Sequence, residues 1–137
     1  PRSFQVAAAF EQELGRHWAL SAGYLRNSTW NLHRMIDRNL FPPTYDATGM
    51  PIFPTTRPDR SIGILQINES SAHSSYDGLL LTVNRRLANR FQLQGSYTYS
   101  VNHDDDSNER DFSRNLVLDP YNLQNQRADS KQDIRHN

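Results

Sequence analysis

Strict alternation of apolar and polar residues is the feature that most limits what this sequence can fold into. In residues 91–102, "FQLQGSYTYSVN", every odd-numbered position is apolar, aromatic or glycine, and every even-numbered position is polar. Successive side chains of a β-strand point to opposite faces of the sheet, so this period predicts a strand with one apolar and one polar face. The sequence therefore poses one main question, which is whether the apolar face meets a protein core or a lipid bilayer.

Three more segments have the same period, and short connections join the four runs into two hairpins. The three segments are "SFQVAAAFEQEL", "HWALSAGYLRNS" and "YDGLLLTVNRRL", the last with Leu80 and Arg85 out of phase. "LGRH" joins the first two, and "LANR" joins the third to residues 91–102. Connections this short predict antiparallel hairpins. The runs exceed the five or six residues of a typical strand.

A long polar segment follows each hairpin. We expect hairpins at about residues 3–28 and 62–102, and long loops at about 29–61 and 103–131. The isoleucines in "SIGILQINESSAHSS" favour an outward extension of the third strand. All long loops would then lie at one end of the sheet. Such loops are uncommon in compact soluble domains, whereas outer-membrane barrels combine short periplasmic turns with long extracellular loops.

The composition is poor for a soluble domain with a large core. Only 36% of the residues are hydrophobic, against about 45–50% in typical domains when glycine is counted. The fifteen basic and fifteen acidic residues cancel, so no bulk attraction to nucleic acid is expected. The chain has no cysteine, which excludes disulfides and thiolate metal sites. The sequence contains no run of eighteen apolar residues, so it predicts no transmembrane helix.

The apolar side of each strand is long enough to cross a bilayer. About five apolar side chains on one face, at about 3.3 Å per residue, make a band about 30 Å tall. Aromatic residues lie toward the edges of this band, as they do in the interfacial girdles of membrane barrels. The opposite face is rich in Gln, Ser, Thr, Asn and Glu, which a hydrated lumen accepts. We expect these residues to face lipid: Phe4, Val6, Phe10, Trp18, Leu20, Tyr24, Leu79, Leu81, Val83, Phe91, Leu93, Tyr97, Tyr99 and Val101.

An antiparallel sheet with one solvated face would explain the alternation equally well. The chain would then be a soluble β domain that binds carbohydrate or protein through its loops. That alternative does not explain the strand length or the loops gathered at one end. We therefore favour an all-β fold of long antiparallel hairpins, a four-stranded piece (plus a partial strand) of a transmembrane β-barrel with long extracellular loops.

Four strands are too few for a complete membrane barrel. A barrel needs at least about eight strands to close, and open sheet edges cannot sit in lipid. The chain also begins at Pro1 without a methionine and shows no signal-peptide pattern. We expect residues 1–137 to be one internal fragment of a barrel domain, with any signal peptide and plug domain outside it.

The sequence resembles the barrel of TonB-dependent outer-membrane receptors, particularly the subgroup with a carboxypeptidase-regulatory-like N-terminal extension. "SSAHSSYDGLLLTVNRRLANRFQLQGSYTYSVNHDDDSN" is similar to that subgroup's strand–turn–strand followed by an acidic loop. "LDPYNLQNQRADSKQDIRH" resembles its loop returning into the next strand. "FQVAAAFEQELGRHWALSAGYLRNSTWNLHRMIDRN" resembles the preceding hairpin. The resemblance spans nearly the whole chain and rests on this pattern, not on a catalytic signature.

The resemblance implies a 22-stranded barrel in the bacterial outer membrane, closed by a plug domain. Such a receptor imports a scarce ligand, for example a siderophore or a glycan, with energy from the TonB complex. The implied partners are outer-membrane lipid, the protein's own plug domain, the remaining barrel strands and the TonB complex, with no nucleic acid. The plug and the TonB box would lie outside this chain. A porin-like barrel without a plug is a further alternative.

No pattern in the sequence indicates catalysis, and we expect neither enzyme activity nor a cofactor. Asp104, Asp106 and Asn108 fall at positions 1, 3 and 5 of a calcium-binding loop, but Glu109 and Asn115 stand where that loop needs Gly and Glu. An EF-hand is therefore excluded, and Asp104 and Asp106 remain weak candidates for a looser cation site.

The proline-rich loop holds four candidates for ligand contact by stacking or by anion binding: Tyr45, Phe53, Arg57 and Arg60. The simpler interpretation is a cover stiffened by proline, with no specific ligand.

Overall fold

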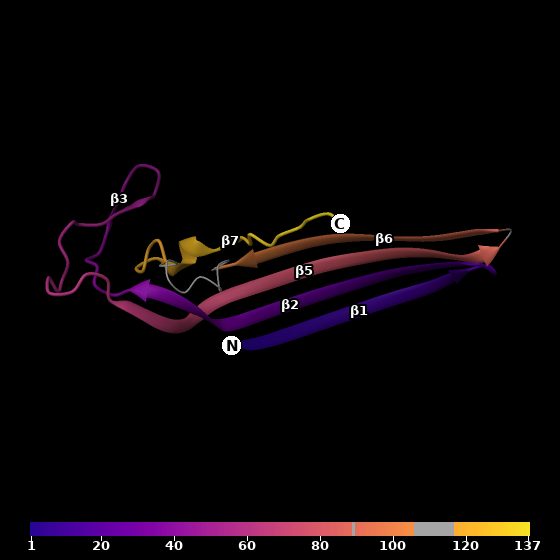
Figure 1. Cartoon of the computed structure of the whole chain (residues 1–137), viewed down its shortest axis with the longest axis horizontal. Helices are drawn as coiled ribbons and strands as arrows, with labels where there is room; N and C mark the ends of the chain where they lie inside the picture. The colour runs from indigo at the N-terminus through magenta and orange to yellow at the C-terminus, as the bar shows by residue number, and fades with distance from the viewer. Residues whose placement is uncertain (89, 106–116) are drawn as a thin grey trace.

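The computed structural model describes residues 1–88, 90–105 and 117–137. Four long strands lie side by side in one extended layer (Figure 1), and short elements decorate one end of it. The long strands are β1 (Arg2–Leu14), β2 (Trp18–Asp37), β5 (Gln66–Ala88) and β6 (Phe91–Asp104). The short elements are β3 (Thr44–Tyr45), β4 (Pro51–Ile52), the 3-10 turn η1 (Leu123–Gln126) and β7 (Ala128–Asp129).

The main sheet is antiparallel, in the order β1-β2-β5-β6-β7, and β3 and β4 form a separate small hairpin. The prediction of an all-β fold built from long antiparallel hairpins is confirmed. Within the described residues, no helix is long and apolar enough to span a membrane. After β7 the chain follows the free edge of β6, where Tyr99 bridges to His136 and the Thr98 amide donates to the Asn137 carbonyl at 2.8 Å. The last loop therefore returns into the next strand, as its sequence indicated.

Both short turns lie at one end of the sheet, and the long loops lie at the other (Figure 1). The first turn, residues 15–17, begins at Gly15, whose φ of 67° is most favourable for a residue without a side chain. The Arg86 amide donates to the His17 carbonyl at 2.8 Å, which ties this turn to β5. The second turn connects β5 to β6, where Ala88 pairs with Phe91.

The strand register places the residues predicted to face lipid on one face, which we call the apolar face. Directly opposed residues of an antiparallel pair point to the same side. One row across the sheet consists of Phe10, Ala22, Leu81 and Tyr97. Phe91 lies beyond a register shift, but the Arg85 guanidinium stands over both the Trp18 ring (5.5 Å) and the Phe91 ring (4.7 Å).

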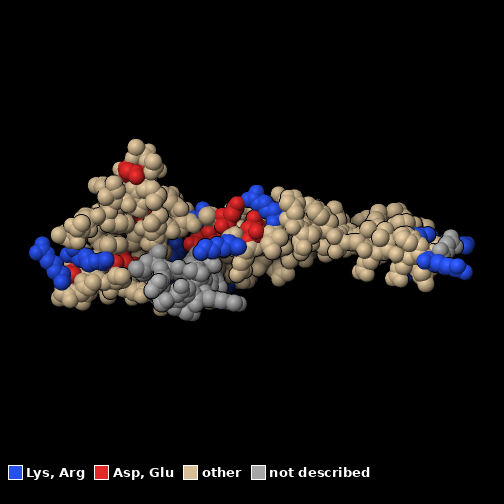
Figure 2. Space-filling view, turned by 45° about the horizontal axis from the view of Figure 1, so that its top comes forward, with Lys and Arg blue, Asp and Glu red and all other residues tan. Residues whose placement is uncertain are grey.

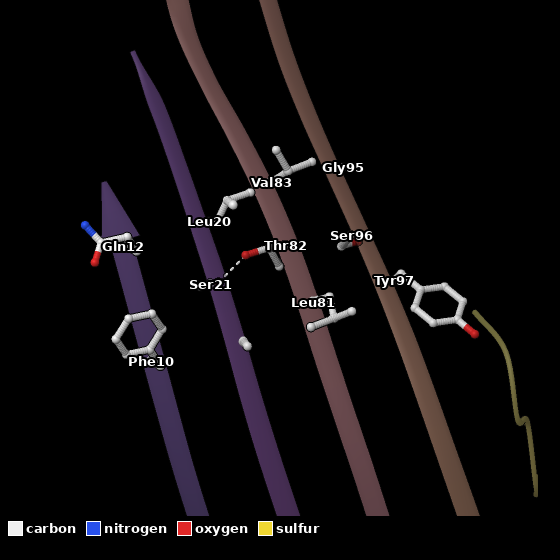
Figure 3. Close-up of a pocket in the computed structure, with 11 residues that line it drawn as sticks. Phe10, Gln12, Leu20, Ser21, Leu81, Thr82, Val83, Gly95, Ser96 and Tyr97 are labelled. Carbon is white, nitrogen blue, oxygen red and sulfur yellow. Dashed lines mark hydrogen bonds between the residues drawn. The ribbon is translucent and has the colours of Figure 1, made fainter. Parts of the chain in front are cut away.

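None of the described residues packs over the apolar face at the level of this row. Phe10 is 65% exposed and Leu81 is 41% exposed. A shallow hollow of about 690 Å³ lies on the sheet. Figure 3 shows its lining side chains, which come from four strands and include Phe10, Leu20, Leu81 and Tyr97. Among the described residues the buried hydrophobic side chains are only Ile36 and Ala72. The sheet is a single layer, so whatever covers its apolar face comes from outside it.

The opposite face carries hydroxyl, amide and carboxylate groups. The Ser21 and Thr82 hydroxyls are hydrogen-bonded across β2 and β5, as Figure 3 shows, and the Ser3 and Thr29 hydroxyls are 2.9 Å apart across β1 and β2. Glu11 lies opposite Ser21 on the same face. We call this the polar face.

Strand β2 continues past residue 28, where the sequence placed the end of the first hairpin, and ends at Asp37. The alternation is broken there by Asn31, an extra residue between the Trp30 and Leu32 pairs, with a φ of 60°. This β-bulge hides the strand from a period-two search. Strand β5 begins at Gln66, not near residue 62, because residues 62–65 belong to the preceding loop.

The bulge predicts a side-chain requirement at position 31. Asn adopts a positive φ more readily than most residues, and a β-branched residue is strained there. Asn31→Val is expected to lower the free energy of unfolding of the barrel by about 1–2 kcal/mol, while Asn31→Gly leaves it nearly unchanged. Urea unfolding of the lipid-reconstituted barrel measures this, with Ser28→Val on the regular part of β2 as the control. Equal losses for both valine variants would contradict the strain argument.

Candidate functional site

Asp37, at the outer end of β2, organises the loop that follows it. Its carboxylate accepts hydrogen bonds from the Arg57 guanidinium (2.7 Å), the Asn39 amide (2.9 Å) and the Leu65 amide (3.0 Å). Asp37 is only 3% exposed. Burial raises the pKa of this carboxyl, but the bonds from Arg57 and from the two backbone amides outweigh it and hold the pKa below its usual value. The strand end thus carries a buried charge that is fully paired.

Asn39 joins the start of the same loop to its end. Its side-chain NH2 group donates to the carbonyls of Gly63 (2.8 Å), Asp59 (2.9 Å) and Ile62 (3.1 Å). Its side-chain oxygen accepts from the Asp59 amide at 2.9 Å. Asn39 is only 3% exposed, and all polar groups of its side chain are hydrogen-bonded. We call such a buried side chain, which holds two segments of a loop together, a fastener. Residues 38–65 are therefore a closed, internally bonded loop.

The two long loops are bonded to each other. The Tyr45 hydroxyl donates to the Asp119 carboxylate at 2.8 Å, and the Tyr121 hydroxyl donates to the Leu40 carbonyl at 2.7 Å. Asp119 is only 2% exposed, and its bond raises the pKa of Tyr45. We call residues 38–65 together with 117–127 the loop cap. It stands over the outer end of β2 and β5 (Figure 1).

These contacts define the roles of the loop residues predicted to meet a ligand. Arg57 is used internally, on Asp37 and on the Asn39 carbonyl. The Tyr45 hydroxyl is committed to Asp119, although the residue is 49% exposed. Phe53 is half-buried and Arg60 is exposed. Among the described residues, Phe53 and Arg60 make no side-chain hydrogen bond or ion pair, and ligand contact stays a prediction for all four residues.

Of the two weak cation candidates, the structure describes only Asp104. Asp104 is the last residue of β6 and pairs with Ala128 of β7. Asp106 lies outside the described residues. Throughout the part of the chain that the structure describes, no group of three or more His, Asp or Glu side chains could hold a metal ion.

The lowered pKa of Asp37 predicts acid sensitivity of the loop cap. A carboxyl with a lowered folded-state pKa stabilises the folded form above its unfolded pKa of about 3.9, and this stabilisation is lost as the pH falls through the folded value. Asp46 and Asp59 in the same loop also have lowered pKa values, because Thr48 and Ser61 donate to them. We expect the protection factors of residues 38–65, which are exchange rates corrected for their intrinsic pH dependence, to be unchanged from pH 7 to 5 and to fall below about pH 4. A fall already between pH 7 and 5 would contradict this.

Charged side chains mark the outer limit of the apolar face. Arg26 and Asp77 are opposed on β2 and β5, 3.6 Å apart, and the Tyr24 hydroxyl donates to Asp77 at 2.5 Å. One same-face position farther out, opposite Ser75, His103 is paired with Asp129 at 3.0 Å. Figure 2 shows acidic and basic residues at mid-length, then a stretch of this face without Lys, Arg, Asp or Glu, then basic residues at the short-turn end. We call this line of charges the outer rim.

The distance between the two charged ends fits a bilayer. Arg85 and Asp77 lie on the apolar face of β5 at the inner and outer limits of the uncharged stretch. Eight residues at about 3.4 Å each make about 27 Å along the strand. With the strand tilt of about 40° usual in membrane barrels, this is about 20 Å of membrane thickness, close to the apolar band of about 25 Å in such barrels.

The comparison with known families answers the question of lipid or core. A family model described as "Outer membrane beta barrel domain" matches residues 1–137. No curated protein and no solved structure matches the chain. The family, the exposed apolar face and the charged limits agree on a membrane wall, so the soluble alternative is set aside. The chain belongs to the outer membrane β-barrel domain family, and its place is the bacterial outer membrane.

Proposed function

We propose that this chain forms barrel wall and extracellular loops of a TonB-dependent receptor that takes up a scarce ligand. The apolar face lies against lipid and the polar face lines the interior. The sheet leaves one edge of β1 without a partner strand among the described residues, so further barrel strands pair with it. The proposal rests on the strand–turn–strand and acidic-loop pattern of the sequence together with the architecture of the outer end.

The observation that carries the proposal is the rigid loop cap beyond the outer rim. Strands β2 and β5 both continue past the Arg26–Asp77 pair, by eleven residues each. A passive wall needs no such extension. The buried fasteners Asp37, Asn39 and Asp119 fix the backbone of the cap, and a fixed backbone presents exposed side chains such as Arg60 to a ligand at low entropic cost.

The remaining partners follow from the same proposal. A plug domain would occupy the interior beside the polar face, and the TonB complex would act on that plug. The ligand class, siderophore, glycan or similar, is part of the proposal. So is the expectation that the chain binds no nucleic acid, needs no cofactor and catalyses no reaction.

Single-channel conductance tests the proposal without knowledge of the ligand. The intact barrel that carries this chain, reconstituted in planar bilayers, is expected to show no open pore, because a plug fills it. A site-specific photo-crosslinker in the periplasmic N-terminal region is expected to capture TonB in cells. A stable open conductance and no TonB adduct would refute the receptor and favour the porin-like barrel, which the polar face also suits.

A further inference from the structure

Arg34, on β2 above the outer rim, is a buried cation with unused hydrogen-bond donors. The residue is 3% exposed. Its Nη2 donates to the Ser71 carbonyl at 2.5 Å and to the Asp105 carboxylate at 3.0 Å. Its Nε and Nη1 are buried and have no hydrogen-bond partner. Buried polar groups are nearly always satisfied, so two free donors on one guanidinium indicate a missing acceptor.

The free donors belong to a residue that lines a pocket of about 400 Å³. Arg127 lines the same pocket, and its guanidinium donates to the Ser75 hydroxyl at 3.0 Å. His73 and Asp105 complete the charged lining, with the His73 ring nitrogen 3.2 Å from the Asp105 carboxylate. Within this lining two guanidinium groups face one carboxylate. The Glu69 carboxylate, opposite Arg34 on β5, is engaged by Arg38 and the Ser71 hydroxyl. The excess positive charge and the free N–H groups suit an anion with several acceptor oxygens.

The pocket opens on the same side of the sheet as the apolar face. Ser75 and His73 precede Asp77 on β5 at alternate positions, so they point to the same side as Asp77 and Leu79. His73 is four residues beyond Asp77, about 13 Å along the strand. At a tilt of about 40° this is about 10 Å above the outer rim. That level lies beyond the acyl chains, where the headgroups of the outer leaflet are found.

From this position we propose that the Arg34–Arg127 pocket binds a phosphate group of a lipid headgroup in the outer leaflet. The phosphate would accept from a free N–H of Arg34, Nε–H or Nη1–H, which lie on different edges of the guanidinium, and from Arg127. The headgroup would thereby hold an outer-leaflet lipid against the barrel wall. The proposal rests on the orientation of the apolar face given above, and it does not depend on uptake or on TonB.

Thermal unfolding of the purified intact barrel in detergent, with lipopolysaccharide as the probe, tests the proposal. Added lipopolysaccharide is expected to raise the unfolding temperature of the wild type, and its apparent affinity is expected to fall about tenfold or more in Arg34→Gln and in Arg127→Gln. Arg16→Gln, an exposed arginine in the first short turn and outside the pocket, is the control for loss of one positive charge and should bind as the wild type does. Arg127 takes no part in the buried bonds of Arg34, so its variant keeps the test valid if Arg34→Gln fails to fold.

Two further arms separate the possible sources of phosphate. Dephosphorylated lipopolysaccharide should stabilise the wild type no more than it stabilises Arg127→Gln, and inorganic phosphate at the same concentration should have little effect. Equal stabilisation by the dephosphorylated lipid, or by inorganic phosphate alone, would overturn the proposal. The mobility shift of the folded barrel on unheated gels verifies insertion independently, so a failure of the wall orientation would be recognised separately.

Discussion

Leu81→Arg is expected to lower the free energy of unfolding of the lipid-embedded barrel by about 2–4 kcal/mol. Leu81 lies in the middle of the uncharged stretch, between Asp77 and Arg85 on β5, and it lines the apolar hollow with Tyr97 opposite. A guanidinium there must leave water for hydrocarbon or reach along the strand toward an interface. Either course has a cost that depends on depth in the membrane.

The matched control for this substitution is Ser96→Arg. Ser96 pairs with Thr82, one residue from Leu81 along β5, but on the polar face. An arginine at that position meets water in the lumen and is expected to cost less than about 1 kcal/mol. Urea unfolding in liposomes of both variants provides the comparison. Equal losses at the two positions would mean that the two faces meet similar surroundings, which contradicts a barrel wall.

Asn39→Ala is expected to open the loop cap while the barrel wall stays folded. The substitution removes the donor to three loop carbonyls and the acceptor for the Asp59 amide. Each buried group left unsatisfied costs about 1–3 kcal/mol. Because the Asn39 side chain bonds to the loop and not to the paired strands, we expect amide exchange in residues 38–65 to accelerate about 100-fold, equivalent to about 2.7 kcal/mol.

Exchange in β5 and β6 at membrane depth should remain as in the wild type after this substitution. Asn68→Ala serves as the control, since Asn68 is an exposed residue on β5 beside the same loop. If Asn39→Ala leaves the exchange of residues 38–65 unchanged, the fastener role is wrong. If it accelerates exchange in the whole sheet equally, the loop cap and the wall open as one cooperative unit and not independently of each other.

The wall of this protein is readable from its sequence because its constraints are local. Period-two alternation identifies the strands, and a two- or three-residue connection fixes each hairpin register, so Phe10, Leu81 and Tyr97 could be assigned to one face without coordinates. Membrane strands also face two very different media, which keeps the pattern strict. The alternation failed as a guide only where Asn31 inserts one residue and shifts the register.

The outer end could not be read in this way, because its contacts join residues that are far apart in the chain. Arg57 was predicted to contact a ligand, and nothing near it in the sequence indicates that it forms an ion pair with Asp37. Asn39 fastens the far end of the loop, and Tyr45 meets Asp119 across a longer separation still. An asparagine or aspartate at the end of a strand is a weak signal, since such residues are common in any turn.

Accessibility of single cysteines on the two faces tests the barrel wall most directly. The chain contains no cysteine, so Leu81→Cys, Leu93→Cys, Thr82→Cys and Gln94→Cys each introduce a unique thiol into it. In intact outer membranes the variants at Leu81 and Leu93 are expected to react only with a membrane-permeant thiol reagent. The variants at Thr82 and Gln94 are expected to react with a water-soluble one. Equal shielding at all four positions would show that protein covers the apolar face. The interpretation of this sheet as part of a membrane barrel wall would then be wrong.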